Sequence, residues 1–331
     1  MEASACANRF MEEFSTDLSC IIFDDIKVFS MLTIAYDPIY AHPLPEGHRF
    51  PMLKYELIPG QLLHEGIITE ANIFSPDLLS EDIILRTHTT DYWHRLKSGE
   101  LTAKEMRAIG FPQSAGLVER EIKISQGTID CTLNAMQYGV SLNVAGGTHH
   151  AFADHGEGFC LLNDFAIASN YLLDNKLAQK ILIVDLDVHQ GNGTASIFKN
   201  DDRVFTFSMH GEHNYPFHKE KSDLDIGLPN DTNGDDYLRI LAKALPQLIE
   251  KVKPGFICFV AGVDVLATDK FGKLKLSIAD CKSRDEIVFT NCKMHNIPVA
   301  VAMGGGYSPD VRDIVEAHCN TYKIAKNIFE L

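Results

Sequence analysis

ILIVDLDVHQG, residues 181–191, is the most informative stretch of the chain. Its apolar run, residues 181–184, does not alternate between apolar and polar residues as a half-exposed strand does. A continuous apolar run is typical of a strand that is buried on both faces of a parallel sheet. The run leads into Asp185, Asp187 and His189, and residues two apart in an extended chain share one face. The stretch therefore predicts a buried strand with three polar side chains grouped at its carboxyl end.

Three further apolar runs also end in polar or glycine-rich clusters. They are residues 138–144 before Gly-Gly-Thr-His-His (146–150), residues 256–261 before Gly-Val-Asp (262–264), and residues 298–303 before Gly-Gly-Gly-Tyr (304–307). Functional groups of open parallel sheets gather beyond the carboxyl ends of the strands. The four runs together predict an α/β fold with one functional site at one edge of the sheet.

The remaining chain fits a single domain. Amphipathic patterns predict helices over residues 91–97, 163–173, 235–251 and 279–295, and strands over residues 31–36 and 83–87. Ser308 as N-cap and Pro309 predict the start of a last helix. Because no repeat or linker divides the chain, we expect one domain over residues 31–331. Residues 1–30 do not join this pattern and are interpreted as an upstream extension or a short N-terminal element.

Composition excludes several classes of protein. The 331 residues carry 45 acidic and 30 basic side chains, a formal net charge of −15, which argues against direct binding of nucleic acid or of an anionic membrane. No apolar stretch reaches the ~20 residues that span a bilayer. The eight cysteines form no Cys-x-x-Cys pair, so we expect free thiols and a cytoplasmic setting, with Cys160 as a packing residue.

Asp187, His189 and Asp264 are the candidate metal ligands. Two carboxylates and one imidazole leave a coordination position open for water, as in catalytic rather than structural zinc sites. Taken alone, Asp-x-Asp-x-His also fits a solvated loop or a magnesium site. Because four strand ends meet at one edge of the sheet, a metal centre is favoured over these alternatives. The four clusters that follow the strands together predict a metal-dependent amidohydrolase.

Two other clusters offer catalytic groups. His149 and His150 are interpreted as acid and base for an attacking water, since an imidazole titrates near neutrality. The glycines at 304–306 allow close backbone packing, which can hold the Tyr307 hydroxyl against a reacting carbonyl. The plainer alternatives are an incidental histidine pair and a flexible turn with a surface tyrosine.

With these motifs the chain resembles the histone deacetylase superfamily of zinc-dependent amidohydrolases, which includes acetoin-utilisation proteins and acetylpolyamine amidohydrolases. The resemblance runs from about residue 31 to 329 and rests on HPLPEGHRFP (42–51), GGTHHA (146–151), GFCLLND (158–164) and the motifs of Asp185, Asp264 and Tyr307. Residues 146–151 and 185–193 look like the class IV branch. The resemblance implies an arginase/deacetylase-like parallel sheet of about eight strands, flanked by helices.

The resemblance also implies a role for each residue. Asp187, His189 and Asp264 would bind zinc; His150 would take a proton from the attacking water, with His149 as acid or electrostatic partner. Tyr307 would polarise the amide carbonyl, and Asp185 would orient His149. A potassium ion would use Asp185, Asp187, His189 and Ser208, and the acyl-lysine channel would be lined by Gly158, Phe159 and Tyr215.

Two departures from the family pattern concern the base and the substrate. Asn192 stands where many relatives have a carboxylate, and a neutral amide raises an imidazole pKa less, so we expect His150 to be a weaker base. No acid before residues 110–112 is a clear match for the substrate clamp of many relatives; Glu100 and Glu105 are the nearest.

Two substrate hypotheses and one non-catalytic alternative follow. The leading one is an ε-N-acyl-lysine of a protein, with the acyl length open, including fatty acyl groups. The alternative is a small acylated amine such as an acetylpolyamine, since an acidic surface suits a cationic partner of either kind. A non-catalytic acyl-lysine reader is disfavoured because the catalytic set is complete.

Overall fold

The eight strands of the sheet are ordered β2-β1-β3-β8-β7-β4-β5-β6 in the computed structural model, which describes residues 31–331. They are β1 (Thr33–Ala35), β2 (Ile73–Phe74), β3 (Val140–Asn143), β4 (Ile181–Asp185), β5 (Val204–Gly211), β6 (Leu224–Leu228), β7 (Phe256–Val260) and β8 (Val299–Ala302). Every pairing is parallel. The prediction of a single α/β domain with a parallel sheet is confirmed.

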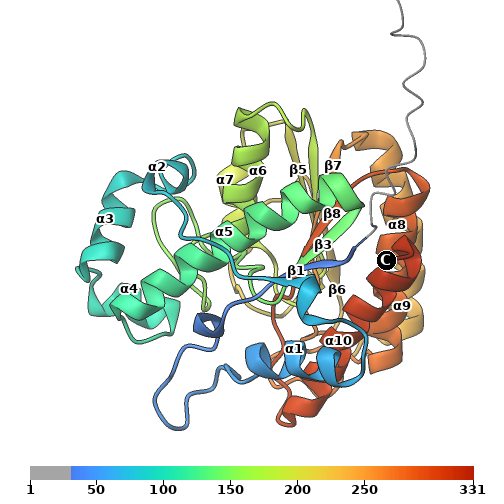
Figure 1. Cartoon of the computed structure of the whole chain (residues 1–331), viewed down its shortest axis with the longest axis horizontal. Coiled ribbons are helices and arrows are strands. Elements are labelled where there is room, and N and C mark those ends of the chain that lie inside the picture. The colour runs from blue at the N-terminus through green and yellow to red at the C-terminus, as the bar shows by residue number, and fades with distance from the viewer. Residues whose placement is uncertain (1–30) are drawn as a thin grey trace, which may run out of the picture. The chain divides into compact units, whose positions relative to one another are not determined.

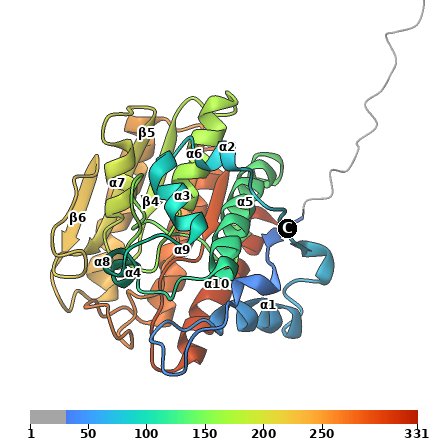
Figure 2. The ribbon, with the colours of Figure 1, turned by 90° about the vertical axis from the view of Figure 1, so that its left-hand side faces the viewer.

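Helices cover both faces of the sheet, as Figures 1 and 2 show from two sides. They are α1 (Lys54–His64), α2 (Glu81–Ile84), α3 (Thr90–Ser98), α4 (Ala103–Ile109), α5 (Ala115–Tyr138), α6 (Asp164–Asp174), α7 (Asn192–Phe198), α8 (Gly234–Val252), α9 (Ile278–Met294) and α10 (Val311–Phe329). Helices α5, α6 and α7 lie on one face, and α8, α9 and α10 lie on the other. This layering buries the central strands on both sides.

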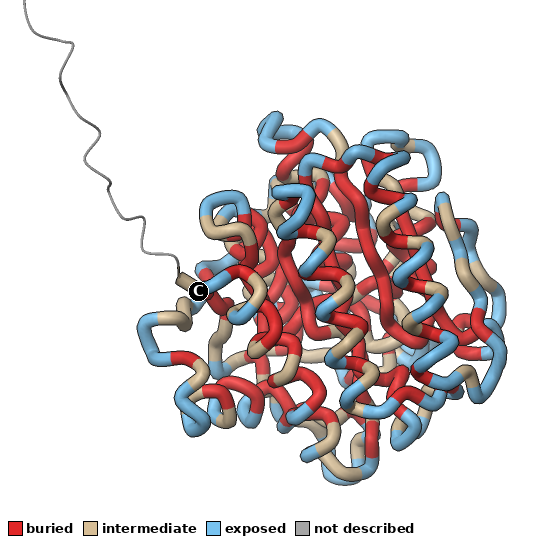
Figure 3. The backbone as a smooth tube through the Cα atoms, turned by 90° about the vertical axis from the view of Figure 1, so that its right-hand side faces the viewer, coloured by how far each residue is buried: buried red, intermediate tan, exposed pale blue. Residues whose placement is uncertain are grey.

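Burial explains why the central strands lack alternation. All residues of β4, β7 and β8 are buried, and Figure 3 shows buried strands between helices whose outer faces are exposed. Leu182 and Val184 pack into one apolar cluster, whereas Ile181 and Ile183 pack into a second. Each strand therefore needs apolar side chains on both faces.

Most predicted helices are confirmed at their expected places. Helix α6 begins after Asn163, whose side chain accepts a hydrogen bond from the Ala166 amide. Helices α3, α8 and α9 cover the predicted stretches 91–97, 235–251 and 279–295 to within one residue at either end.

Two sequence predictions are wrong. Residues 83–87 form no strand, because Glu81 and Asp82 stabilise the first turn of helix α2, which ends at Ile84, and residues 85–87 form a turn. The last helix does not begin at Ser308, whose hydroxyl lies 2.9 Å from that of Thr268. Asp310 caps α10 instead and accepts the Arg312 amide.

The cysteines of residues 31–331 are free and buried, as expected. The pKa of Cys160 is raised well above the ordinary value by burial, which suits a packing role. Cys6 and Cys20, like the predicted extension over residues 1–30, lie outside the described residues. Within residues 31–331, no helix combines the length and the apolar character required for a membrane crossing.

Candidate active site

Asp187, His189 and Asp264 meet at the carboxyl edge of the sheet. Asp187 and His189 follow β4 and Asp264 follows β7, and these strands are direct neighbours. The His189 Nδ1 atom lies 3.0 Å from Asp187 Oδ1 and 3.1 Å from Asp264 Oδ2. One ligand atom of each residue lies within 4.8 Å of the others, and all three residues are buried. The structure thus brings the three predicted metal ligands together.

The electrostatics of this group fit a bound cation. Burial and the charge of Asp187 raise the pKa of Asp264 to about 7. Burial lowers the pKa of His189, but hydrogen bonds and charges from Asp187 and Asp264 outweigh it and raise the pKa to about 10. Closely spaced buried carboxylates are costly without a cation, and two oxygens with one imidazole nitrogen suit a divalent metal.

Metal affinity is expected to rise with pH. In the metal-free protein a proton on His189 supplies the positive charge between the carboxylates, and a metal must displace it. Loss of one proton per metal makes affinity increase about tenfold per pH unit between pH 8 and 9, above the pKa of Asp264 and below that of His189. Competition with a chelator of known affinity measures this slope. A flat profile would show that His189 carries no proton for the metal to displace.

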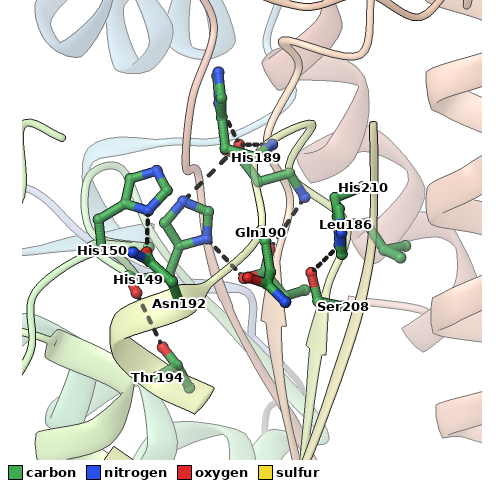
Figure 4. A network of polar contacts seen from close by, with 12 residues as sticks. His149, His150, Leu186, His189, Gln190, Asn192, Thr194, Ser208 and His210 are labelled. Atoms are coloured by element: carbon green, nitrogen blue, oxygen red, sulfur yellow. Dashed lines mark hydrogen bonds and ion pairs between the residues drawn. The ribbon is translucent and has the colours of Figure 1, made fainter. Parts of the chain in front are cut away.

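His149 and His150 lie side by side with opposite electrostatic surroundings (Figure 4). His149 Nδ1 is 2.6 Å from Asp185 Oδ2; burial lowers its pKa, but Asp185 and Asp187 raise it to about 9. Burial and the charges of His149 and His189 hold the pKa of His150 well below the ordinary value. At neutral pH the metal-free site therefore holds one protonated and one neutral imidazole.

Asn192 lies behind His150, with its Oδ1 2.6 Å from His150 Nδ1. The Asn192 amide nitrogen donates to Glu157 Oε1 at 2.5 Å. A carboxylate only accepts hydrogen bonds, so Glu157 requires the NH₂ group of Asn192 and turns the amide oxygen toward His150. His150 then donates from Nδ1 and keeps Nε2 unprotonated. The sequence analysis missed Glu157 because nothing in its local pattern connects it with Asn192.

The loop after β3 that carries His149 and His150 is fixed by a buried acid and by close backbone packing. Asp164 accepts hydrogen bonds from the amides of Gly147 and Thr148 at 3.1 and 2.9 Å. A Cβ at Gly147 would lie 2.9 Å from the Gly304 Cα atom. The glycines of the two loops are therefore needed for packing, as predicted for residues 304–306.

Tyr307 is held at the site by its backbone and by neighbouring rings. Its amide donates to Asp269 Oδ2 at 2.6 Å, and its ring centroid lies 6.4 Å from that of His189. Burial and the charges of Asp264 and Asp187 raise the pKa of its phenol well above the ordinary value. The hydroxyl therefore stays protonated and able to donate.

Lys54 is a further residue that the sequence analysis missed. This buried lysine donates to the carbonyl of Gly304 at 2.9 Å and so fixes the loop before Tyr307. Burial lowers its pKa to about 8.

A cavity of about 550 Å³ leads to the site. Gly158, Phe159 and Tyr215, the predicted channel residues, all line it together with His150, His189 and Tyr307. A smaller inner pocket of about 40 Å³ shares lining residues with it and extends toward Gly304 and Arg120. A Cβ at Gly158 would lie 2.6 Å from the His150 ring, so glycine is required there.

Ser208, the remaining predicted potassium ligand, stands on β5 opposite Asp185 of β4. Its Oγ lies 2.9 Å from His210 Nδ1 (Figure 4). Burial lowers the pKa of His210 to about 4, which keeps that ring neutral at ordinary pH.

Neither acid suggested for the substrate rim lines the cavity. Glu105 accepts from Arg95 Nη1 at 2.7 Å and from the Thr102 amide at 2.8 Å, as part of the capping of α4. Glu100 is exposed in the turn before that helix. Neither Glu100 nor Glu105 therefore faces this cavity.

Comparison with known proteins identifies the family. Residues 48–322 match the sequence profile of the histone deacetylase domain. An uncharacterized protein of Picosynechococcus is 44% identical over 296 residues, which cover 89% of this chain and 99% of that protein. Histone deacetylase 2 of Arabidopsis thaliana is 31% identical over 291 residues, covering 85% of this chain and 75% of that protein. The chain belongs to the histone deacetylase family.

A solved structure shares the fold. The HDA15 HD domain superposes with a TM-score of 0.77 at 19% identity, covering 91% of this chain and 88% of that domain. Membership of the family implies a deacylase hydrolase that acts on an acylated substrate. The resemblance seen in the sequence motifs is confirmed.

Proposed function

We propose that this protein is a zinc-dependent deacylase that hydrolyses ε-N-acyl-lysine. The observation that carries the proposal is a geometric one: two adjacent buried imidazoles, His149 against the Asp185 carboxylate and His150 against the Asn192 amide, lie beside the buried Asp187–His189–Asp264 group. Groups whose environments push their pKa values apart are typical of acid–base catalysis.

Asp187, His189 and Asp264 would hold the metal. Bound there, zinc would supply a Lewis acid for the amide carbonyl and lower the pKa of a water molecule. A potassium ion near Asp185 and Ser208 is proposed as a structural partner of this site. A cytoplasmic location stays a prediction from the free cysteines.

The two histidines would divide the proton transfers. Neutral His150, with Nε2 unprotonated, would take a proton from the attacking water. His149, protonated and bonded to Asp185, would stabilise the developing negative charge and supply a proton toward the leaving amine. The protonated hydroxyl of Tyr307 would donate to the oxyanion of the tetrahedral intermediate.

The large outer cavity and the small inner pocket support a substrate arm that ends in a short acyl group. Phe159 and Tyr215 would flank the lysine methylenes, and the acyl group would enter the inner pocket. Because that pocket measures about 40 Å³, we propose an acetyl group rather than a fatty acyl group.

Turnover of zinc-loaded protein on acyl-lysine peptides from acetyl to myristoyl, with acetylpolyamines alongside, tests the proposal. We expect cleavage of acetyl-lysine that the Tyr307→Phe variant loses. Cleavage of acetylpolyamines alone would move the assignment to a small-molecule deacetylase. A zinc-loaded protein that cleaves nothing would contradict the proposed function.

Glu157→Ala is expected to lower kcat/KM about 10-fold, because the Asn192 amide would no longer be held with its oxygen toward His150. In a protein that already carries Asn192→Asp, Glu157→Ala is expected to leave kcat/KM unchanged or to raise it. A carboxylate at 192 accepts from His150 without orientation, and Glu157 would only repel it.

Steady-state kinetics of the parent protein, Glu157→Ala, Asn192→Asp and the double variant measure the effect. Equal losses in both backgrounds would show that Glu157 supports the fold rather than the amide orientation.

A further inference from the structure

The mouth of the active-site cavity is lined by cations from separate segments of the chain. The basic side chains are Arg49, Arg107, Lys270 and Lys273, and no Asp or Glu lines the cavity. This is contrary to the composition, in which 45 acids outnumber 30 bases. We call these four residues the basic mouth. An excess of one charge at a cavity entrance attracts ligands of the opposite charge.

The basic mouth lacks internal counter-charges. Across residues 31–331, none of its four side chains forms an ion pair within 4.0 Å. Lys273 Nζ donates to the carbonyl of His213 at 2.8 Å, which leaves its charge uncompensated.

Arg49 is positioned rather than freely mobile in solvent. Its guanidinium carbon lies 5.0 Å from the centroid of the Phe159 ring and 5.5 Å from that of Phe271. Phe159 and Phe271 both line the cavity, and the Phe271 ring lies tilted against that of Tyr307 with centroids 5.0 Å apart. Contact with aromatic faces restrains a guanidinium without neutralising its charge.

The orientation of the bound substrate determines which part of it contacts the basic mouth. If the acyl group occupies the inner pocket, the amine part of the substrate emerges through the mouth. We propose that the substrate carries carboxylates close to the acylated amine, as an acyl-lysine flanked by Asp or Glu in a peptide does. This inference rests on the proposed deacylase function and names its substrate class.

The same argument disfavours acetylpolyamines and lysine-rich peptides. A polyamine would bring ammonium groups to four uncompensated cations, and like charges repel. The acidic charge of the whole protein therefore does not predict a cationic substrate, because the charge at the mouth has the opposite sign.

Three acetyl-lysine peptides of equal length, with acidic, neutral or basic flanks, test the proposal together with acetylspermidine. For zinc-loaded protein we expect kcat/KM to be about 10-fold higher on the acidic than on the basic peptide, chiefly through KM. The preference is expected to shrink with added NaCl, because salt screens exposed charges.

Lys270→Glu/Lys273→Glu is expected to reverse the order of the acidic and basic peptides. Lys243→Glu/Lys282→Glu is the matched control, since it makes the same charge change on α8 and α9 outside the cavity lining. The control is expected to keep the acidic preference. No preference in the parent protein, or the same shift in both double variants, would overturn the basic mouth as a specificity element.

Binding measured by fluorescence anisotropy on zinc-loaded Tyr307→Phe separates this inference from the proposed function. Tighter binding of the acidic peptide without turnover by the parent protein would support the basic mouth and contradict the deacylase. Turnover of peptides with equal or tighter binding of the basic one would support the deacylase and overturn the basic mouth.

Discussion

Tyr307→Phe is expected to lower kcat about 100-fold or more, since it removes one donor to the developing oxyanion. The ring would remain between Phe271 and His189, because its contacts involve no hydroxyl hydrogen bond among the described residues. KM is expected to change little, because the hydrogen bond strengthens mainly in the transition state.

Steady-state turnover on an acetyl-lysine peptide, together with metal analysis of the same sample, measures this effect. Tyr171→Phe is a matched control, because it removes a phenol hydroxyl from helix α6 outside the cavity. Full activity of Tyr307→Phe with metal bound would remove Tyr307 from the proposed mechanism.

Asp264→Ala is expected to abolish stoichiometric metal binding and, with it, turnover. The change removes one of three ligands and leaves His189 with a single acidic neighbour within 3.1 Å. Loss of even an outer hydrogen-bond partner costs about 10–100-fold in metal affinity, so loss of a ligand is expected to cost more.

Asp264→Asn provides the control for folding. Asp264 Oδ1 also accepts the Val188 amide at 2.9 Å, and an asparagine oxygen can keep that bond. We expect both variants to lose the metal while Asp264→Asn retains the parent circular dichroism spectrum. A full equivalent of tightly bound zinc in either variant would show that the ligand set is wrong.

The sequence predicted the parts of the fold whose local pattern depends on burial. Strands β4, β7 and β8 are continuous apolar runs because both of their faces are covered. Strands β2 and β6 were not predicted, because they lie at the sheet edges and are only partly buried. Strand β5 was not predicted either, because Thr206, Ser208 and His210 interrupt its apolar pattern although the strand is almost wholly buried. Residues 83–87 were misassigned because a short apolar run is equally compatible with strand and helix.

The candidate site was predictable where its residues follow strands and not where they act across the fold. The positions of Asp187, His189 and Asp264 follow from strand ends that meet at one edge. Glu157, Lys54 and the basic mouth depend on which loops come together in space, and no local pattern specifies that. Ser308 is a further example, because its hydroxyl contacts that of Thr268, which is distant in sequence, instead of capping the last helix.

The strand order has a consequence for how the chain folds during synthesis. Strand β8 is near the C-terminus, yet it lies between β3 and β7 in the sheet. On the ribosome, the two halves of the sheet have no central strand to join them until residues 299–302 have emerged. The two halves therefore join only after residues 299–302 have been translated. Because non-local parallel pairing is also slow, we infer that nascent chains expose the edges of β3 and β7 until then.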